Sequence, residues 1–195
     1  MGLNFRINDT THIYNAVVNS CKNAGLKILM GEKLSGWNIL WSGPIKGDFL
    51  RDFTKYQKVN HFPDSCQIGR KDYMWKNIKR LKRVHGNEFD FCPETYLLPD
   101  DYKKWMQDRE NEGWTSYWIM KPNAASCGRG IKILAPKQAP QKKNGYLACK
   151  YVSNPHLIDG FKYDLRVYVL VSSFDPLKVY VYDEGLARFA TEKYT

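Results

Sequence analysis

Charged and apolar side chains alternate along residues 161–172. A repeat of two residues is typical of a β-strand, in which successive side chains point to opposite faces. Lys162, Asp164 and Arg166 occupy every second position, so one strand would place all three on the same face. Leu165 and Val167 begin the alternate set, which we expect to pack against a core. Two cations and a carboxylate on one strand face suit a charged ligand better than a packed interior, where unpaired charges are costly.

Three strands are predicted at the end of the chain. The turn sequence Ser-Phe-Asp-Pro follows the alternating segment, and a second apolar run occupies residues 177–183. We expect these two segments to form a β-hairpin. Residues 185–190 are predicted to form a third antiparallel strand.

Helical and strand patterns alternate through the first 150 residues. Asp9 or Thr10 is suited to cap a helix that Gly25 ends, and its inner face would carry Ile13, Val17 and Cys21. A second helix is predicted to start at Pro99. Residues 57–70 contain breakers and are expected to be irregular. Short apolar runs predict strands at residues 27–29, 37–41, 118–120, 131–134 and 146–151.

A further helix is predicted over residues 72–85, with Gly86 as its stop. Apolar residues recur on one side at helical spacing, and cations fill most other positions. These cations form either an ordinary solvated surface or a docking surface for an acidic chain, and the sequence leaves both interpretations open. The cations are Lys76, Lys79, Arg80, Lys82 and Arg83.

Composition narrows the class of partner. The 195 residues carry a formal net charge of +10, which favours an acidic partner such as nucleic acid, an anionic membrane or an acidic polypeptide. No apolar run approaches the length of a membrane span, and residues 1–8 contain no long apolar stretch typical of a signal peptide. The five cysteines are scattered without a CxxC pair, so neither a zinc site nor a disulfide framework is indicated.

A lysine and a glycine-containing loop form the first candidate binding element. Lys121 ends a predicted strand, and Gly128, Arg129 and Gly130 follow in the next loop. Glycines let backbone amides approach a phosphate closely, and a lysine beside them can meet its charge. Neither a Walker A motif nor a dinucleotide fingerprint is present, so a plain hairpin turn remains the alternative.

The strand charges and a later arginine form the second candidate element. Lys162, Asp164 and Arg166 suit either a nucleotide with its metal or a surface ladder of ion pairs. Arg188 lies among apolar residues and needs an acidic partner. That partner is either the carboxylate of a ligand or a neighbouring Asp183 or Glu184.

Seven short motifs stand in one order along the chain: YQKVNHFP at 56–63, RKD at 70–72, WIMKP at 118–122, GRGI at 128–131, KYDLR at 162–166, DP at 175–176 and EGLARFAT at 184–191. In this order they resemble the tubulin tyrosine ligase-like family. The chain is more similar to the glutamylases of that family than to its founding tyrosine ligase.

The resemblance implies a mixed α/β (α+β) fold of the ATP-grasp type, truncated at its carboxy-terminal lobe. Its parts would be an amino-terminal lobe at 1–65, a central lobe at 66–151 and the start of a carboxy-terminal lobe at 152–195. The implied activity is ATP-dependent addition of glutamate to glutamate side chains of tubulin tails, through an acyl-phosphate. ATP and Mg²⁺ are the implied cofactors.

The resemblance also implies partners and a location. The implied partners are tubulin tails or microtubules and free glutamate, and neither nucleic acid nor a membrane is implied. The protein would be a monomer in the cytoplasm, on the microtubule cytoskeleton, including the cilium or basal body. The competing interpretation is a non-catalytic basic module that binds microtubules or another polyanion. A nucleic-acid binder is the third interpretation. Stabilisation of the protein by an ATP analogue would distinguish the ligase from the two binding modules.

The family's site residues can be carried onto matching positions here. Lys71 and Lys121 would contact phosphates, and the loop with Cys127, Gly128, Arg129 and Gly130 would cover them. Lys162 and Asp164 would hold the nucleotide. The adenine hinge would consist of Cys149, Lys150, Tyr151 and Val152.

Two arginines would act on the reacting groups. Arg166 would stabilise the reacting carboxyl or acyl-phosphate, and Arg188 would bind the carboxylate of the incoming amino acid.

Three features depart from the family pattern. Cys149 stands where some relatives carry glutamine, and Cys127 stands where some glutamylases carry arginine. The family's metal-binding Glu-x-Asn segment has no counterpart in these 195 residues, so no metal ligand is assigned within them. We therefore expect this chain by itself to lack ligase activity.

Overall fold

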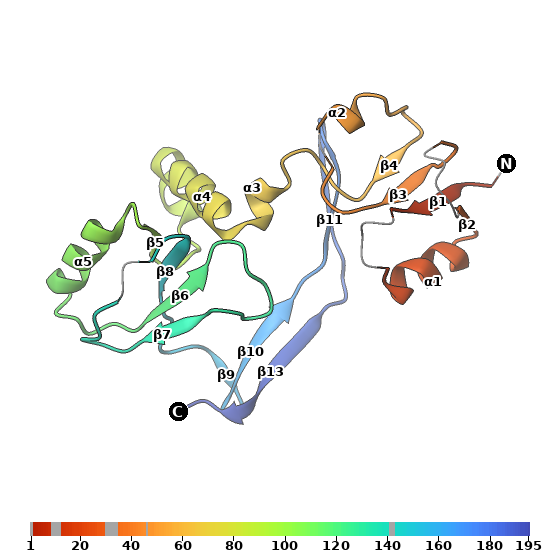
Figure 1. Ribbon diagram of the computed structural model, residues 1–195. Helices are drawn as coiled ribbons and strands as arrows, with labels where there is room; N and C mark the ends of the chain where they lie inside the picture. The colour runs from red at the N-terminus through yellow and green to blue at the C-terminus, as the bar shows by residue number, and fades with distance from the viewer. Residues whose placement is uncertain (1, 9–12, 30–34, 46, 141–142) are drawn as a thin grey trace. The chain divides into compact units, whose positions relative to one another are not determined.

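The computed structural model describes residues 2–8, 13–29, 35–45, 47–140 and 143–195. The chain divides into two compact units, Met1–Phe91 and Cys92–Thr195 (Figure 1). The three lobes expected from the sequence have different boundaries, and they stay a prediction. The elements form a mixed α/β structure with several sheets.

The first unit contains a four-stranded parallel sheet in the order β2-β1-β3-β4. Its strands are β1 (Asn4–Ile7), β2 (Lys27–Leu29), β3 (Ile39–Trp41) and β4 (Lys58–Val59). Phe5, Trp37 and Leu40 are buried and form its core. The sequence pattern predicted β2 and β3 but missed β1, because Asn4–Ile7 carries only two apolar residues.

The helices of the first unit correct two expectations. The first helix, α1 (Asn15–Asn23), begins later than predicted, and Ile13 lies outside it with an exposed side chain. The expected caps at Asp9 and Thr10 lie outside the described residues. The segment predicted to be irregular contains β4 and α3 (Cys66–Gly69), both too short to give a periodic signal.

The predicted basic helix is confirmed as α4 (Lys71–His85). Gly86 ends it with a φ of 62° and donates its backbone N–H to the Lys82 carbonyl. A positive φ favours glycine, which explains the stop. Two short elements complete the unit, α2 (Gly47–Leu50) and the 3-10 turn η1 (Gly86–Phe89).

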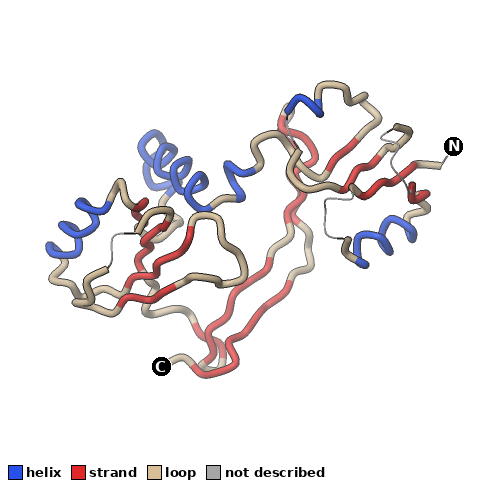
Figure 2. The backbone as a smooth tube through the Cα atoms, in the orientation of Figure 1, coloured by secondary structure: helices blue, strands red, loops and turns tan. Residues whose placement is uncertain are grey.

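The second unit begins with an antiparallel sheet of order β5-β8-β6-β7, which we call the central sheet (Figure 2). The helix α5 (Tyr102–Asn111) packs on one face through the fully buried Trp105. The strands are β5 (Thr95–Leu98), β6 (Trp118–Pro122), β7 (Lys132–Leu134) and β8 (Tyr146–Lys150).

Aromatic packing forms the core of this unit. The rings of Trp105 and Trp118 meet edge to face at 5.5 Å, and Tyr96 lies 5.6 Å from Trp118. Arg109 is also buried, with its guanidinium 4.4 Å from the Trp114 ring, and its Nη2 donates to the Gln138 carbonyl at 3.2 Å. These contacts fix α5 and the segment after β7 against the sheet.

The last strands differ from the prediction in their pairing. The long strand expected over residues 161–172 breaks into β10 (Phe161–Arg166) and β11 (Val169–Phe174). The hairpin of β11 with β12 (Leu177–Val181) is confirmed. The third strand, β13 (Leu186–Lys193), pairs with β10, and β9 (Leu157–Ile158) lies on the other side of β10.

The expectation that Leu165 and Val167 face a core is wrong. Their exposed fractions are 67% and 56%, because no layer among the described residues covers this side of the strands. Alternation identifies two faces of a strand, but burial requires a second layer.

None of the described helices is long and apolar enough to cross a membrane.

The buried Tyr96 generates a prediction about stability. Its hydroxyl is hydrogen-bonded to Asp108 Oδ2 at 2.6 Å and contacts the Glu94 carboxylate. Burial, and then the hydrogen bonds to these two carboxylates, raise the pKa of Tyr96 far above its usual value. Folding therefore keeps the phenol protonated at a pH where the unfolded chain loses that proton, so stability should fall as pH rises above about 10.

We expect Tyr96→Phe to cost about 1–3 kcal/mol near pH 7, because a hydrogen bond to a charged group is lost. The same variant should lose less stability than the parent between about pH 10 and pH 11. Urea unfolding across this range measures both effects, with Tyr180→Phe, an exposed tyrosine, as the matched control. Equal alkaline loss in the parent and in Tyr96→Phe would contradict this account.

Candidate functional site

The central sheet presents Lys121 and Cys149 on the same face. Strands β6 and β8 pair Ile119 with Cys149 and Lys121 with Leu147, so side chains at these four positions project together. The intervening residues of β6, Trp118 and Met120, belong to the core against α5. The structure therefore brings the predicted phosphate lysine and the first predicted hinge residue to the face opposite α5.

Lys162 lies against the end of this sheet, although it belongs to β10. Its Nζ donates to the Tyr151 hydroxyl at 2.8 Å and lies 4.5 Å from the centre of the Tyr151 ring. The ring of Tyr194 is 5.5 Å from the same nitrogen. No carboxylate lies within salt-bridge distance of this ammonium anywhere in the described ranges. Its charge can therefore meet an anionic ligand.

The two tyrosines around Lys162 respond to its charge and to each other. The Lys162 hydrogen bond, followed by the one from Tyr194, lowers the pKa of Tyr151. The hydrogen bond to Tyr151 raises the pKa of Tyr194. Tyr194 donates its backbone N–H to the Gly160 carbonyl, and its hydroxyl oxygen lies 3.1 Å from the Ser153 carbonyl oxygen. No motif in the sequence indicated Tyr194.

The other predicted hinge residues differ in their contacts. Lys150 forms a salt bridge with Glu112 at the end of α5, and this contact lowers the pKa of Glu112. The ammonium of Lys150 is therefore engaged, so a hinge contact from this residue would come from its backbone. Val152 is exposed, and the backbone N–H of Tyr151 donates to the Tyr117 carbonyl at 2.9 Å.

The glycine-containing loop connects β6 to β7, as predicted. Cys127, Gly128 and Gly130 have φ angles of 57°, 71° and 72°. A Cβ at Gly130 would stand 2.9 Å from Pro122 Cγ, so this position combines a positive φ with a close approach to β6. Arg129 donates its backbone N–H to the Ser126 carbonyl at 3.2 Å, which closes a turn. The loop thus keeps a tight backbone next to the Lys121 strand.

Asp164 and Arg188 form a two-pronged ion pair across β10 and β13. The two strands place these residues opposite each other, and Arg188 Nε and Nη2 donate to the two carboxylate oxygens at 2.7 and 2.6 Å. The hydrogen bond to Arg188 is the main cause of the lowered pKa of Asp164, and the charge of Arg166 adds to it. The sequence alternatives of Asp183 and Glu184 as partners of Arg188 are wrong, because the strand register selects Asp164.

Arg166 ends β10 on the same strand face as Asp164 and is exposed. Gly185 fits closely beside it, since a Cβ at Gly185 would lie 2.6 Å from the Arg166 carbonyl oxygen. Lys71, by contrast, begins α4 in the first unit, between the paired Arg70 and Asp72. The structure places Lys71 within its own unit and leaves its role with the others a prediction.

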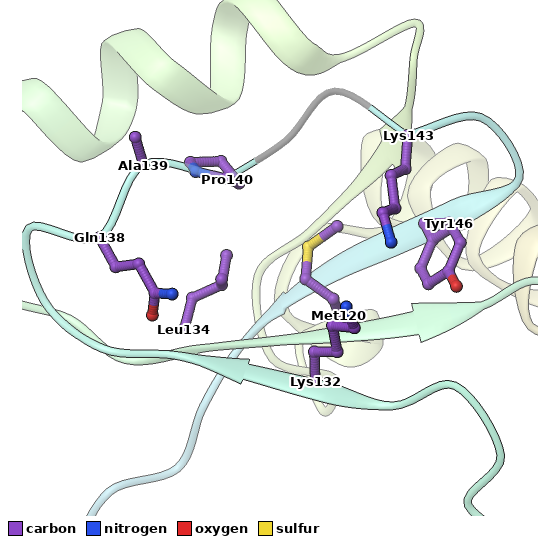
Figure 3. Close-up of a pocket in the computed structure, with 8 residues that line it drawn as sticks. All are labelled: Met120, Lys132, Leu134, Gln138, Ala139, Pro140, Lys143 and Tyr146. Atoms are coloured by element: carbon purple, nitrogen blue, oxygen red, sulfur yellow. The ribbon is translucent and has the colours of Figure 1, made fainter.

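A separate pocket of about 250 Å³ lies on the α5 side of the central sheet (Figure 3). Met120 and Leu134 form its apolar floor, and Lys132 and Lys143 bring two ammonium groups to it. None of the predicted site residues lines this pocket. In the part of the chain that the structure describes, no group of three or more His, Cys, Asp or Glu residues could hold a metal ion.

Comparison with known proteins gives the family. A model of the tubulin-tyrosine ligase family matches residues 50–195. The chain is 45% identical over 161 residues to tubulin polyglutamylase TTLL5 of Homo sapiens, covering 81% of this chain and 12% of that protein. It is 40% identical over 160 residues to tubulin monoglutamylase TTLL4 of Homo sapiens, covering 82% and 13%.

A third relative matches over almost the whole chain. Tubulin polyglutamylase TTLL13 of Mus musculus is 38% identical over 191 residues, which is 96% of this chain and 23% of that protein. The chain thus spans less than a quarter of the length of each of these three relatives. Because the family model covers well over half of the residues, the resemblance seen in the motifs is confirmed, and this chain belongs to the tubulin-tyrosine ligase family.

Proposed function

We propose that this chain forms part of an ATP-dependent carboxylate–amine ligase that adds glutamate to glutamate side chains of tubulin tails. The observation that carries the proposal is the Lys162 ammonium, held by Tyr151 next to the sheet face of Lys121, without a carboxylate partner among the described residues. The relatives named tubulin polyglutamylase and monoglutamylase support the choice of acceptor and donor. An ATP-grasp fold is part of this proposal.

The residues on the sheet face fit a nucleotide. ATP, when bound with Mg²⁺, would supply the phosphoryl group that activates the acceptor carboxyl as an acyl-phosphate. Lys121 and Lys162 offer positive charge for phosphates, and the loop through Gly128 and Gly130 allows close backbone approach. The segment from Cys149 to Val152 supplies the edge on which adenine would lie.

The Asp164–Arg188 pair supports the role proposed for the donor amino acid. Arg188 already binds a carboxylate through two nitrogens, and the same geometry suits the α-carboxylate of free glutamate. In this proposal, glutamate takes over the guanidinium of Arg188, and Asp164 turns to the nucleotide. Arg166 stabilises the charge that develops on the reacting carboxyl.

The proposal includes Mg²⁺ but no residue of this chain that binds it. Mg²⁺ needs several oxygen ligands, and we assign none to this chain, since the Glu-x-Asn segment of the family has no counterpart in its 195 residues. Tubulin or microtubules, free glutamate and a monomeric state in the cytoplasm on the microtubule cytoskeleton complete the proposal.

Ligand protection tests the nucleotide site directly. A non-hydrolysable ATP analogue with Mg²⁺ at about 100 times its Kd should stabilise the chain by about 2.7 kcal/mol. Lys162→Ala should remove most of this protection, because it deletes the ammonium, whereas Lys104→Ala on α5 should retain it. Each variant is compared with and without the analogue, so a change in its own melting temperature does not affect the result.

Thermal unfolding gives the measurement. The account is contradicted if the analogue fails to protect the parent chain, or if both lysine variants keep full protection. No protection together with strong binding to microtubules would favour the non-catalytic basic module.

Activity of the isolated chain gives a second test. We expect no incorporation of labelled glutamate when the chain is incubated with ATP, Mg²⁺ and tubulin, because the Glu-x-Asn segment that binds the metal in this family has no counterpart in the 195 residues. A full-length polyglutamylase under identical conditions is the positive control. Incorporation above the level without ATP would show that the 195 residues hold a complete catalytic centre.

A further inference from the structure

We propose that the outer face of α4 is a docking surface for an extended, glutamate-rich peptide, outside the nucleotide site. This inference rests on the proposed function, which requires the chain to act on an acidic tail. It adds a place where the tail binds. The surface consists of Lys76, Arg80 and Arg83, which we call the basic stripe.

Helical spacing aligns the basic stripe. Arg80 follows Lys76 by four residues and Arg83 follows Arg80 by three, so the three side chains lie along one face of α4. All three residues are exposed, whereas Ile78 on the opposite side of the helix is buried. The stripe therefore faces solvent within its unit, and the helix is anchored by its other side.

The stripe carries positive charge without internal compensation. Elsewhere on and next to α4, cations have acidic partners: Lys82 contacts Asp90, and Arg70 is paired with Asp72 at 2.8 Å. By contrast, no carboxylate in the described segments lies within salt-bridge distance of Lys76, Arg80 or Arg83. The three positive charges repel one another, and an acidic ligand bound to them would relieve this repulsion.

The spacing of the stripe is comparable to that of an extended acidic chain. Along the axis of α4, Lys76 and Arg80 are about 6 Å apart and Arg80 and Arg83 are about 4.5 Å apart. Alternate residues of an extended strand point to the same side and lie about 7 Å apart. Successive carboxylates on one side of a glutamate-rich peptide can thus meet successive cations of the stripe, while the peptide backbone runs along α4.

Binding of a labelled glutamate-rich peptide to the chain tests this surface. Fluorescence anisotropy at about 50 mM salt should show binding that weakens as salt is raised, because exposed charges are screened. The triple variant Lys76→Glu, Arg80→Glu, Arg83→Glu should bind at least about tenfold more weakly. Circular dichroism and thermal unfolding confirm that the variant is folded.

A matched control separates the stripe from net charge. The triple variant Lys103→Glu, Lys104→Glu, Lys178→Glu changes the total charge by the same amount at exposed positions on α5 and β12. It should lose less than about threefold in affinity. Equal losses in the two triple variants would overturn the proposal, as would a parent chain that binds no peptide.

Two further arms identify the partner and isolate the underlying function. Duplex DNA that binds as tightly as the peptide at about 150 mM salt would overturn the proposal in favour of a nucleic-acid surface. Protection by the ATP analogue is measured on the same samples. If the peptide binds through the basic stripe but the ATP analogue gives no protection, the ligase is rejected and the docking surface is retained. If the ATP analogue protects the chain but peptide binding does not depend on the basic stripe, the docking surface is rejected and the ligase is retained.

Discussion

The packing of Trp105 on Trp118 determines which face of the central sheet carries Lys121 and Cys149. This contact occupies one face with α5 and buries both indoles. Because side chains alternate along β6 and β8, the same contact commits Lys121 and Cys149 to the other face. The buried Arg109 strengthens the arrangement, since it lies against Trp114 and holds the backbone at Gln138. The set of side chains on this face therefore follows from the aromatic core on the reverse side of the sheet.

A second contact joins the charged strand to that face. Lys162 reaches from β10 to Tyr151 at the end of the central sheet, so a cation of one sheet borders the predicted hinge of another. Farther along β10, Asp164 and Arg188 neutralise each other across the strands. Lys162 and Asp164 on β10 thus differ in their partners. Lys162 has no carboxylate partner among the described residues, whereas the ion pair of Asp164 and Arg188 must open before either residue can bind a ligand.

Local patterns predicted most of the elements but not their assembly. The helix at α4, the loop after Lys121 and the final hairpin followed from spacing and turn chemistry. The missed strand β1 has too few apolar residues for a periodic signal, and its pairing with β2 and β3 is decided by contacts distant in sequence. The exposed Leu165 shows the same limit, because alternation cannot indicate whether a second layer is present.

The candidate site shows a similar division. The motifs selected Lys162, Asp164 and Arg188, yet the partner of Arg188 depends on strand register, which fixes Asp164 opposite it. Tyr194 was missed because its role arises only when β13 returns beside β10 and carries it to Lys162. Residue types thus selected the candidate residues, while strand register and the return of β13 decided which side chains meet.

Photolabelling with an azido-adenine analogue of ATP tests the central claim most directly. If adenine lies against the end of β8, mass spectrometry should find the label on the peptide containing residues 149–152, and unmodified ATP should prevent labelling. Label that ATP displaces from the pocket around Met120 and Lys143, with none on residues 149–152, would place the nucleotide on the wrong face of the sheet and contradict the account.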